Sequence, residues 1–516
     1  MVQVSLDTAP RAAEPRVGLL EDLESLRDVP TPLTPMAFLE LEERITAAAG
    51  REGDAILAHH VLQAHRDAAF VEQAVAAARG RAAVPLRHKG QRWTSVWLPG
   101  GTEMVVETAY LRPSSRGRRG RKRSRRGPTG VGVYPVLEAL GIADRVSPLT
   151  RSQLALYTVQ AGSYQEAVSL LAERGFQVDE SVLQRVAQST AQADLALRDA
   201  ALAQARQLPV PVDGPLADQR VRASVDGGRV RTRLPRRGRR TKKGRHRYKT
   251  PWREPRMLQI EILDREGKAD RMRLPLYDVL LDDADATVAL VIGYLRLLGA
   301  AHARVVEWIA DGADWIWERS DQIRREAEIP AERWVEVIDF YHASEHLRKT
   351  VELCGGRKAS ERQAWYEELR HVLRREPAGA LQVIDRLAPE ARGRRAAKIK
   401  TAIEYFERHA HRMEYASLDR RRLPVGSGPV ESAVSRVINK RFKGPSIFWN
   451  PNNVDDLMHL RAVFKSGRWH EVIQRVITQT FPVPSFAPMS RKRIRQLSLA
   501  EAREERSCRQ SFPRRA

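Results

Sequence analysis

The stretch Val221-Arg-Ala-Ser-Val-Asp-Gly-Gly-Arg-Val230 alternates apolar and polar residues and places a carboxylate, Asp226, directly before two glycines. Alternation with a period of two is typical of a half-buried β-strand, and it puts Ser224 and Asp226 on the same face. Asp-Gly-Gly is also an ordinary turn signal. The stretch therefore predicts either a simple turn or a strand that carries a functional carboxylate at its end.

A second acid follows an apolar run of strand length. Val305-Val-Glu-Trp-Ile-Ala310 leads into Asp311 and then a glycine, which lets the backbone turn sharply away. The carboxyl ends of buried strands are where α/β sheets place their chemistry. An Asp in this position can also cap a following helix, and Asp314 competes for the same role.

A third acid stands at a predicted helix start. The turn Gly426-Ser-Gly-Pro429 precedes Glu431, and proline suits the first position of a helix. Glu431, Ser435 and Asn439 share the polar face of this helix. A glutamate here could instead simply favour the positive end of the helix dipole. The apolar stripe consists of Val430, Ala433, Val434, Val437 and Ile438.

The region around the first two acids predicts an α/β core. Strands are expected at 221–234, 257–263, 271–277, 304–310 and 334–339, with helices at about 285–300 and 320–328. Three strands, a helix, a strand, a helix and a strand is the element order of the RNase H-like fold, a mixed five-stranded sheet with helices on both faces.

The rest of the chain is predicted to be mainly helical. Ser163 with Glu166 has capping-box spacing and Asp179 can cap the next helix, which predicts a helix-turn-helix over 163–195, although any α-hairpin gives this pattern. The expected segments are 1–128, a helical segment, a β-hairpin over 91–110 and a basic run; 129–207, a helical DNA-binding region; 208–349, the first part of the core; 350–420, an all-helical insertion; 421–445, the second part of the core; and 446–516, a helical region and a basic, poorly ordered tail.

The composition points to a polyanionic partner. Lys and Arg number 88 against 64 Asp and Glu, which gives a formal charge of +24 and an isoelectric point near 10.5. No apolar run approaches the length of a membrane span, and no secretory signal opens the chain. Cys354 and Cys508 are too few and too far apart for a disulfide framework or a cysteine zinc site. A cytoplasmic protein is expected.

Two segments concentrate the positive charge. The run Arg116–Arg126 is either a solvated, mobile segment or an arm that tracks phosphates. The connector Pro235–Arg256 holds eleven Lys or Arg and one acid, Glu254, which suits a loop lying along DNA but is equally compatible with disorder. The predicted DNA contacts are Arg118, Arg119, Arg121, Lys122, Arg123, Arg236, Arg237, Arg239, Arg240, Lys242, Lys243, Arg245, Lys440 and Arg441.

Two aspartates on separate strands and a glutamate on a helix would form an oxygen-only cluster. Such a cluster suits Mg²⁺ or Mn²⁺ and not zinc. Packed carboxylates repel one another, and a divalent ion relieves the repulsion. Two ions could activate a water or a 3′-hydroxyl and stabilise the leaving oxygen in phosphoryl transfer.

Four motifs combine these features: Ser224-Val-Asp-Gly-Gly-Arg-Val230, Ala310-Asp-Gly-Ala-Asp-Trp-Ile-Trp317, Asp339-Phe-Tyr-His-Ala-Ser-Glu-His-Leu347 and Val425-Gly-Ser-Gly-Pro-Val-Glu-Ser432. Together they resemble bacterial insertion-sequence DDE transposases of the ISKra type, related to the Mutator-like superfamily. The resemblance covers about 221–349 and 421–470. It implies that Asp226, Asp311 and Glu431 are the metal-binding triad, with 350–420 inserted before the glutamate helix. Many relatives carry a cysteine-rich ribbon in the N-terminal part, which this chain lacks.

Four further residues have open roles. Asp339, His342 and His346 match an Asp-x-x-His pattern in the family, and we expect them to support the metal ligands or contact phosphate. Zinc is disfavoured because no further ligands accompany the two histidines, and Asp339 could simply cap a helix. Trp449 could stack on an unpaired base at a DNA end, although burial in the core is favoured.

The resemblance implies a transposase that binds terminal inverted repeats, cleaves the transposon ends and joins them to target DNA. We expect two Mg²⁺ ions per active site, double-stranded DNA as the partner, a homodimer or larger assembly on DNA, and association with the nucleoid when bound. The alternatives are a Mg²⁺-dependent nuclease on the same fold and a non-catalytic DNA-binding protein derived from a transposase.

Overall fold

The computed structural model describes residues 2–3, 34–113, 132–238, 240–244, 247–445 and 447–489. The chain forms two compact units, Met1–Ala193 with Val476–Thr478, and Asp194–Arg475 with Gln479–Ala516. The division falls inside helix α7 (Glu180–Ala205). The finer division into six segments stays a prediction. In the described part of the chain, no helix combines the length and apolar character that a membrane span needs.

The first unit contains the predicted β-hairpin. Strand β2 (Leu86–Trp97) pairs antiparallel with β3 (Glu103–Pro113), which β1 (Val2–Gln3) joins in parallel. The buried Asp54 carboxylate accepts hydrogen bonds from the amides of Gly100 and Thr102, at 2.8 and 2.9 Å, so the hairpin turn is tied to a helix. The helices of this part are α2 (Pro35–Arg66) and α3 (Ala68–Arg81).

The predicted helix-turn-helix is present as two capped helices. Helix α6 (Tyr164–Ala172) begins after Ser163, whose hydroxyl accepts a hydrogen bond from the Glu166 amide at 3.0 Å. Asp179 accepts from the Val182 amide at 2.9 Å before α7, and Gly175 at φ +82° turns the chain between them. Two earlier helices are α4 (Pro135–Ala139) and α5 (Pro148–Gln160). The helices are confirmed, and DNA binding by them stays a prediction.

The second unit is built on a mixed five-stranded sheet, as predicted. Its strands are β4 (Arg220–Gly227), β9 (Arg256–Leu263), β10 (Leu276–Leu280), β11 (Val305–Ala310) and β12 (Trp334–Ile338). The spatial order is β10-β9-β4-β11-β12. Strand β9 runs antiparallel to β4 and β10, whereas β11 runs parallel to β4 and β12.

Two strand predictions need correction. The strand expected at 271–277 begins only at Leu276, because the residues before it pair with the C-terminal segment: the Leu274 amide donates to the Ala487 carbonyl at 2.8 Å. The strand expected at 221–234 leaves the sheet after Gly227. Beyond that residue the chain enters two short ribbons of its own.

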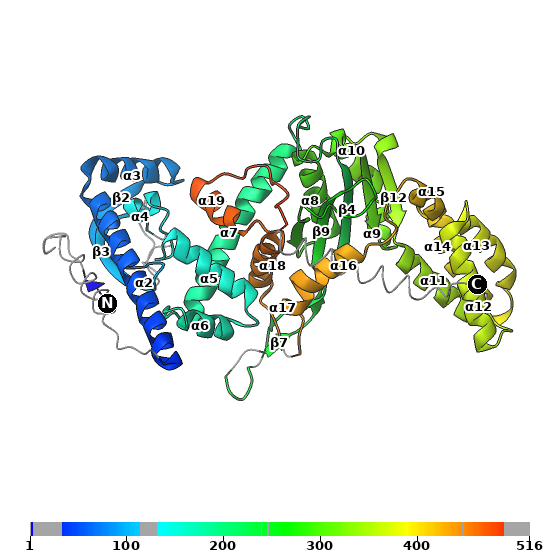
Figure 1. Ribbon diagram of the computed structural model, residues 1–516, viewed down its shortest axis with the longest axis horizontal. Helices are drawn as coiled ribbons and strands as arrows, with labels where there is room; N and C mark the ends of the chain where they lie inside the picture. The colour runs from blue at the N-terminus through cyan, green and yellow to red at the C-terminus, as the bar shows by residue number, and fades with distance from the viewer. Residues whose placement is uncertain are drawn as a thin grey trace. The chain divides into compact units, whose positions relative to one another are not determined.

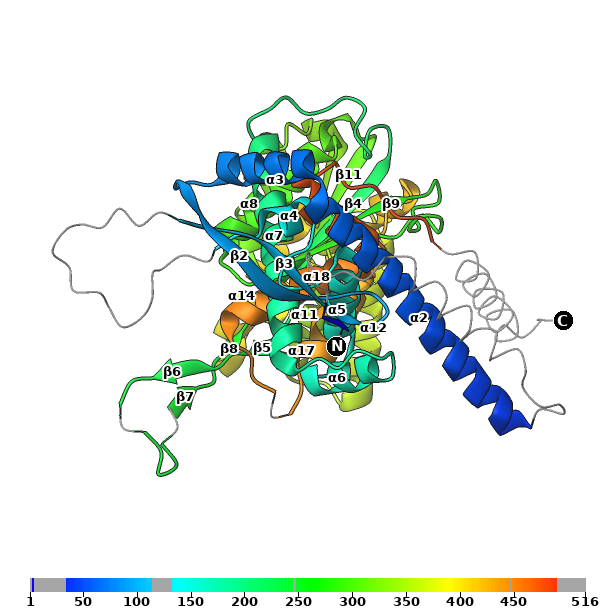
Figure 2. The same cartoon turned by 90° about the vertical axis from the view of Figure 1, so that its left-hand side faces the viewer.

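These ribbons form an arm, defined here as residues 228–255. Strand β5 (Val230–Arg231) pairs with β8 (Trp252–Arg253), and β6 (Leu234–Arg236) pairs with β7 (Arg247–Lys249). Gly227 pairs with Arg256, so β4 and β9 are the two legs of one hairpin and the arm is its extended tip. Figure 2 shows β6 and β7 projecting from the body of the chain. The connector predicted as a loop is therefore a β-ribbon in its described residues.

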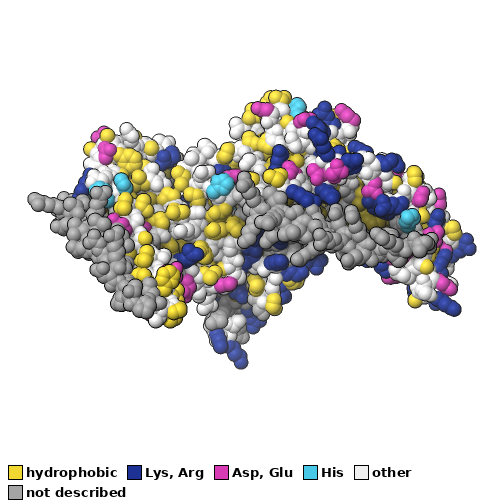
Figure 3. All heavy atoms as spheres, in the orientation of Figure 1, with side chains coloured by type: hydrophobic (Ala, Val, Ile, Leu, Met, Phe, Trp, Pro, Cys, Tyr) yellow, Lys and Arg dark blue, Asp and Glu magenta, His cyan; other side chains and the backbone are white. Residues whose placement is uncertain are grey.

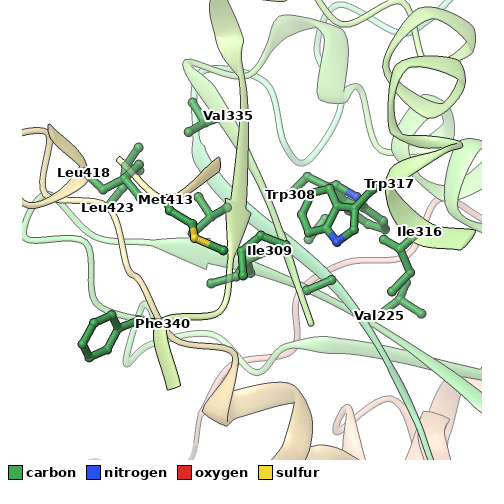
Figure 4. Close-up of a cluster of buried hydrophobic side chains, with 14 of the residues drawn as sticks. Val225, Trp308, Ile309, Ile316, Trp317, Val335, Phe340, Met413, Leu418 and Leu423 are labelled. Atoms are coloured by element: carbon green, nitrogen blue, oxygen red, sulfur yellow. The ribbon is translucent and has the colours of Figure 1, made fainter. Parts of the chain in front are cut away.

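The sheet core is covered by helices and by part of the insertion. Trp308 and Ile309 are successive residues of β11 and point to opposite faces. In Figure 4, Trp308 lies toward Trp317, while Ile309 lies toward Met413 from the insertion. The covering helices include α8 (Ala284–Leu297), α9 (Asp314–Trp317) and α10 (Ser320–Glu326), shown with the strands in Figure 1.

The region after β12 is helical, as predicted for the insertion. Its helices are α11 (Phe340–Leu353), α12 (Ala359–Arg375), α13 (Gly379–Leu387), α14 (Ala396–His409) and α15 (Tyr415–Arg420). The glutamate helix follows as α16 (Gly428–Val434), a π-helical turn η6 (Ser435–Asn439) and α17 (Lys440–Phe442). The last helices are α18 (Pro451–Lys465) and α19 (Trp469–Thr478). The basic tail predicted beyond residue 489 lies outside the described residues.

Candidate active site

Asp226 and Asp311 lie at equivalent positions on neighbouring parallel strands. Ser224 on β4 is the register partner of Ile309 on β11, so two further residues along each chain lead to Asp226 and Asp311. Because side chains alternate, both carboxylates belong to the same face at the same end of the sheet. The pKa of Asp226 is raised to about 6, first by burial and then by the charges of Asp311 and Glu431. The three predicted acids therefore act on one another.

The two glycines after Asp226 are not a tight turn. The strand continues to Gly227, and the Gly228 amide donates to the Pro255 carbonyl at 2.8 Å across the base of the arm. A Cβ on Gly228 would lie 2.8 Å from the Ile438 side chain. Gly228 thus allows the end of β4 to approach η6, which continues the helix that carries Glu431, and the turn interpretation was wrong.

Asp311 holds the turn that follows its strand. Its carboxylate accepts a hydrogen bond from the Ala313 amide at 3.0 Å, and its carbonyl accepts from the Trp317 indole at 2.7 Å. The competing residue, Asp314, is exposed and forms an ion pair with Arg408 at 2.8 Å. Asp311 therefore stabilises the turn after β11 but does not cap α9, whose N-cap is Ala313, while Asp314 is paired with Arg408.

Glu431 lies in the first turn of α16, which packs against β4 and β9. Its carboxylate accepts a hydrogen bond from the Ser427 hydroxyl at 3.3 Å, and its side chain is 49% exposed. Every member of the predicted apolar stripe is buried. A π-helical turn interrupts the helix immediately afterwards, a feature often found at functional sites.

Asp339 caps α11 and also anchors the turn before Glu431. Its fully buried carboxylate accepts hydrogen bonds from the His342 amide, at 2.7 Å, and from the Ser427 amide. Burial opposes ionisation, but these hydrogen bonds outweigh it and lower the pKa of Asp339. The helix-cap interpretation is confirmed, and the same residue positions the glutamate segment.

His342 lies between two of these acids. Its Nδ1 is 3.3 Å from an Asp339 oxygen and 3.9 Å from a Glu431 oxygen. The hydrogen bond to Asp339, with the added charges of Asp311 and Glu431, raises the pKa of His342 to about 9. A positively charged imidazole therefore balances part of the negative charge at neutral pH.

One compact group of ligand atoms differs from the predicted triad. Asp339, His342 and Glu431 each offer an atom within 4.8 Å of the others, a spacing that could hold a metal ion. Asp226 and Asp311 contribute charge to this cluster without joining that group. His346, one helical turn beyond His342, stacks on Tyr405 instead, with ring centroids 4.0 Å apart.

Tyr405 was not identified from the sequence. It belongs to α14 of the insertion, yet a Cβ on Gly312, next to Asp311, would lie 2.6 Å from its ring. Its buried hydroxyl has no hydrogen-bond partner among the described residues, and burial with the charges of Asp311 and Asp339 raises its pKa. The sequence around Tyr405 gives no sign of a functional role, because the pattern of α14 is that of an ordinary amphipathic helix.

Two other predicted contacts are buried. Trp449 is 8% exposed and its indole donates to the Phe442 carbonyl at 3.2 Å, so stacking on a free base is not available to it. Arg441 is 4% exposed, with its guanidinium 5.0 Å from the Trp449 ring centroid. This burial, with the guanidinium over the Trp449 ring in a cation–π contact, gives no support to the predicted DNA contact at Arg441.

Most of the described basic residues of the arm are exposed, whereas Arg231 at its base is partly buried. The exposed residues include Arg236, Arg237, Arg240, Lys242 and Lys243, and Lys440 on α17 is exposed as well. Figure 3 shows Lys and Arg side chains gathered at the tip of the arm, which lies below the label of β7 in Figure 1. Arg239, Arg245 and the predicted contacts Arg118, Arg119, Arg121, Lys122 and Arg123 lie outside the described residues.

The carboxylates suit a hard divalent cation. Asp226, Asp311 and Glu431 could supply oxygen ligands, and a cation would offset the burial and the neighbouring negative charges that raise the pKa of Asp226. Comparison with protein families, curated proteins and solved structures finds no match to this chain. Any function must therefore be argued from the geometry and the sequence.

Proposed function

We propose that this chain is a DNA transposase that cleaves the ends of its element and joins them to target DNA. The observation that carries the proposal is the register of the sheet, which sets Asp226 and Asp311 side by side with Glu431 acting on the same cluster. The four sequence motifs that resemble ISKra-type transposases contain these three acids.

The sheet supports an RNase H-like core. In chain order, the five strands are arranged 3-2-1-4-5, with the second antiparallel to its neighbours and the last two parallel to the first. Asp226 lies at the carboxyl end of the first strand and Asp311 directly follows the fourth, and these two strand ends meet because the strands are parallel. The five helices after β12 then separate the last strand from the glutamate helix.

Asp226, Asp311 and Glu431 would hold the metal ions. Two Mg²⁺ ions supply, when bound, activation of a water or 3′-hydroxyl and stabilisation of the leaving oxygen. The remaining residues position these ligands. Asp339 fixes the Ser427 amide and the His342 side chain, and Ser427 in turn orients Glu431. The charged imidazole of His342 is available to a DNA phosphate near Glu431.

The charge distribution supports DNA as the substrate. The arm carries exposed Lys and Arg and is joined directly to the strand that ends in Asp226. Contacts of this kind, made to phosphates, release counterions and give affinity without sequence recognition. Assembly of two or more copies on paired transposon ends, in the cytoplasm and on the nucleoid, belongs to the same proposal.

The test is strand cleavage and strand transfer by the purified full-length chain on linear DNA carrying the inverted repeats that flank its gene. Mg²⁺-dependent cleavage and joining are expected, and Asp226→Asn and Glu431→Gln should abolish both. Asp314→Asn is the matched control, because that acid is paired with Arg408 outside the cluster, and it should retain activity.

Each rival has its own result in this assay. If the chain cleaves DNA but does not join pre-cleaved ends to target DNA, the result would identify a Mg²⁺-dependent nuclease. Binding of the repeats with no chemistry in the wild-type chain would identify a non-catalytic DNA-binding protein and overturn the transposase assignment.

A further inference from the structure

The base of the arm carries a groove that the acid cluster does not use. The arm-base groove, with a volume of about 540 Å³, is lined by Arg231, Trp252, Asn439, Lys440, Lys443 and Pro445. Its walls are formed by strands β5 and β8 at the arm base and by η6 and α17, which continue the helix that carries Glu431. The groove is therefore lined by segments that continue, along the chain, from two of the elements that carry candidate metal ligands, β4 and α16.

Aromatic rings and arginines alternate along this side of the arm. The Arg231 guanidinium lies 5.2 Å from the Trp252 ring centroid and 5.1 Å from that of Phe448. Arg233 lies 4.8 Å from the Tyr248 centroid and 5.4 Å from that of Phe448. Trp252 remains 49% exposed, which leaves one indole surface open beside a cation.

Two polar atoms at the groove lack hydrogen-bond partners among the described residues. The Asn439 side-chain oxygen is a buried acceptor, and Arg231 Nε is a buried donor. A buried polar atom without a partner costs free energy, which a ligand that supplies the missing hydrogen bond would recover. The groove thus offers an aromatic surface, an amide edge and positive charge together.

We propose that the arm-base groove binds one unpaired nucleotide of a DNA strand, with its base stacked on Trp252. The Asn439 carboxamide then meets the edge of the base, while Lys440 and Lys443 neutralise the adjacent phosphates. Stacking on an exposed aromatic ring with cations nearby is the usual way that proteins hold unpaired bases. A duplex does not fit this role, because its base faces are covered by their neighbours.

This inference rests on the proposed function, since it assigns a site for a separated strand beside the transposition centre. The chain continues from Asp226 through Gly227 and Gly228 into the strand that contains Arg231. A DNA strand held in the groove would therefore start close to the end of β4. The Trp449 backbone pairs with Arg231 and Arg233, at 2.9 and 2.7 Å, and this ties the arm base to the segment after α17.

The experiment compares two single strands of about ten nucleotides. One is oligodeoxythymidylate and the other is an abasic strand of the same length, and binding to the full-length chain is measured by fluorescence anisotropy. The two strands carry the same phosphates, so any difference in affinity reports on the bases. We expect the base-bearing strand to bind about 5- to 100-fold more tightly.

Trp252→Ala should remove this preference, and Trp252→Phe should retain most of it. Trp93, on β2 of the other unit, is exposed to a similar extent at 44%, so Trp93→Ala is the matched control and should change nothing. A double Lys440→Ala, Lys443→Ala variant should weaken both strands equally and flatten the salt dependence.

Equal binding of the two strands by the wild type, or an unchanged preference in Trp252→Ala, would overturn the inference. The catalytic proposal is tested separately: Asp226→Asn should lose cleavage and keep the preference for the base-bearing strand over the abasic strand. An active Asp226→Asn variant with a normal base preference would reject the catalytic assignment alone.

Discussion

Asp339 accepts a hydrogen bond from the backbone amide of Ser427, 88 residues further along the chain. The same carboxylate accepts from the amide and the ring of His342, so one buried acid connects the start of α11 with the turn before Glu431. Because Asp339 joins the two segments that flank the insertion, the insertion does not disturb the positions of His342 and Glu431 in the cluster.

Asp339→Asn should lower the pKa of His342 from about 9 toward its ordinary value of 6.5, because the charge that stabilises the imidazolium is removed. NMR titration of the histidine ring measures this directly. Asp321→Asn, a change at an exposed acid paired with Arg324, is the control and should leave the His342 titration in place. An unchanged pKa in Asp339→Asn would show that the hydrogen bond does not control His342.

Gly228→Ala should reduce activity by displacing the Glu431 helix, since the added Cβ would lie 2.8 Å from Ile438. Loss of activity with a modest change in melting temperature is expected. The double variant Gly228→Ala, Ile438→Ala should recover part of the activity by making room. Gly80→Ala has no neighbour within 4 Å and serves as the control. A fully active Gly228→Ala would show that this close approach is not needed.

Tyr405→Phe should lower turnover by about 10-fold without loss of stability. The buried hydroxyl has no partner among the described residues, so its removal costs the fold nothing, whereas a substrate or water at the cluster would lose a hydrogen bond. Steady-state cleavage rates and thermal unfolding together measure this. Tyr366→Phe, on α12, is the matched control. Equal rates for Tyr405→Phe and wild type would assign Tyr405 to packing alone.

Glu307→Gln should change how stability depends on pH. Glu307 is fully buried on β11 and its carboxyl oxygens have no hydrogen-bond partner among the described residues; burial raises its pKa to about 8. Because the pKa of Glu307 in the folded chain lies above the unfolded value of 4.5, the stabilisation that its protonated form gives is complete below pH 4.5. This stabilisation is lost as the pH rises through 8. Between these two pH values, the free energy of unfolding falls by about 1.4 kcal/mol per pH unit.

Urea unfolding of wild type and Glu307→Gln across this pH range tests the point. The wild type should lose stability relative to the variant as the pH rises. Parallel stability curves would show that Glu307 is ionised in the folded chain or titrates as it does when unfolded.

Asp278→Ala should be strongly destabilising, by about 3–5 kcal/mol, because it removes the buried carboxylate that pairs with Arg198 and leaves that buried cation only the exposed Asp199. Asp278 on β10 accepts hydrogen bonds from Arg198 at 2.9 Å and from the Tyr294 hydroxyl at 2.7 Å, and it is 1% exposed. Asp218→Ala breaks an exposed pair with Arg304 and should leave the unfolding midpoint in place. Similar midpoints for Asp278→Ala and wild type would contradict a structural role for this network.

Much of the core could be predicted from periodicity. The strands that carry or precede Asp226 and Asp311 are local apolar runs whose pattern is visible in any short window; both begin within one residue of the prediction, although the first ends at Gly227 and not at residue 234. The Glu431 helix was equally clear, because its turn, its proline and its apolar stripe are consecutive in the chain. The sequence by itself thus determined the elements, the three acids and the basic character of the arm.

Tertiary structure alone decided how these parts meet. Gly228 against Ile438, Asp339 on the Ser427 amide and Tyr405 beside Gly312 each join residues that are far apart in the chain, and no local pattern encodes such contacts. Burial was decided in the same way: Arg441 and Trp449 lie inward, whereas Trp252 stays open at the arm base. Periodicity reports which face of an element is apolar, but only packing determines which neighbour covers it.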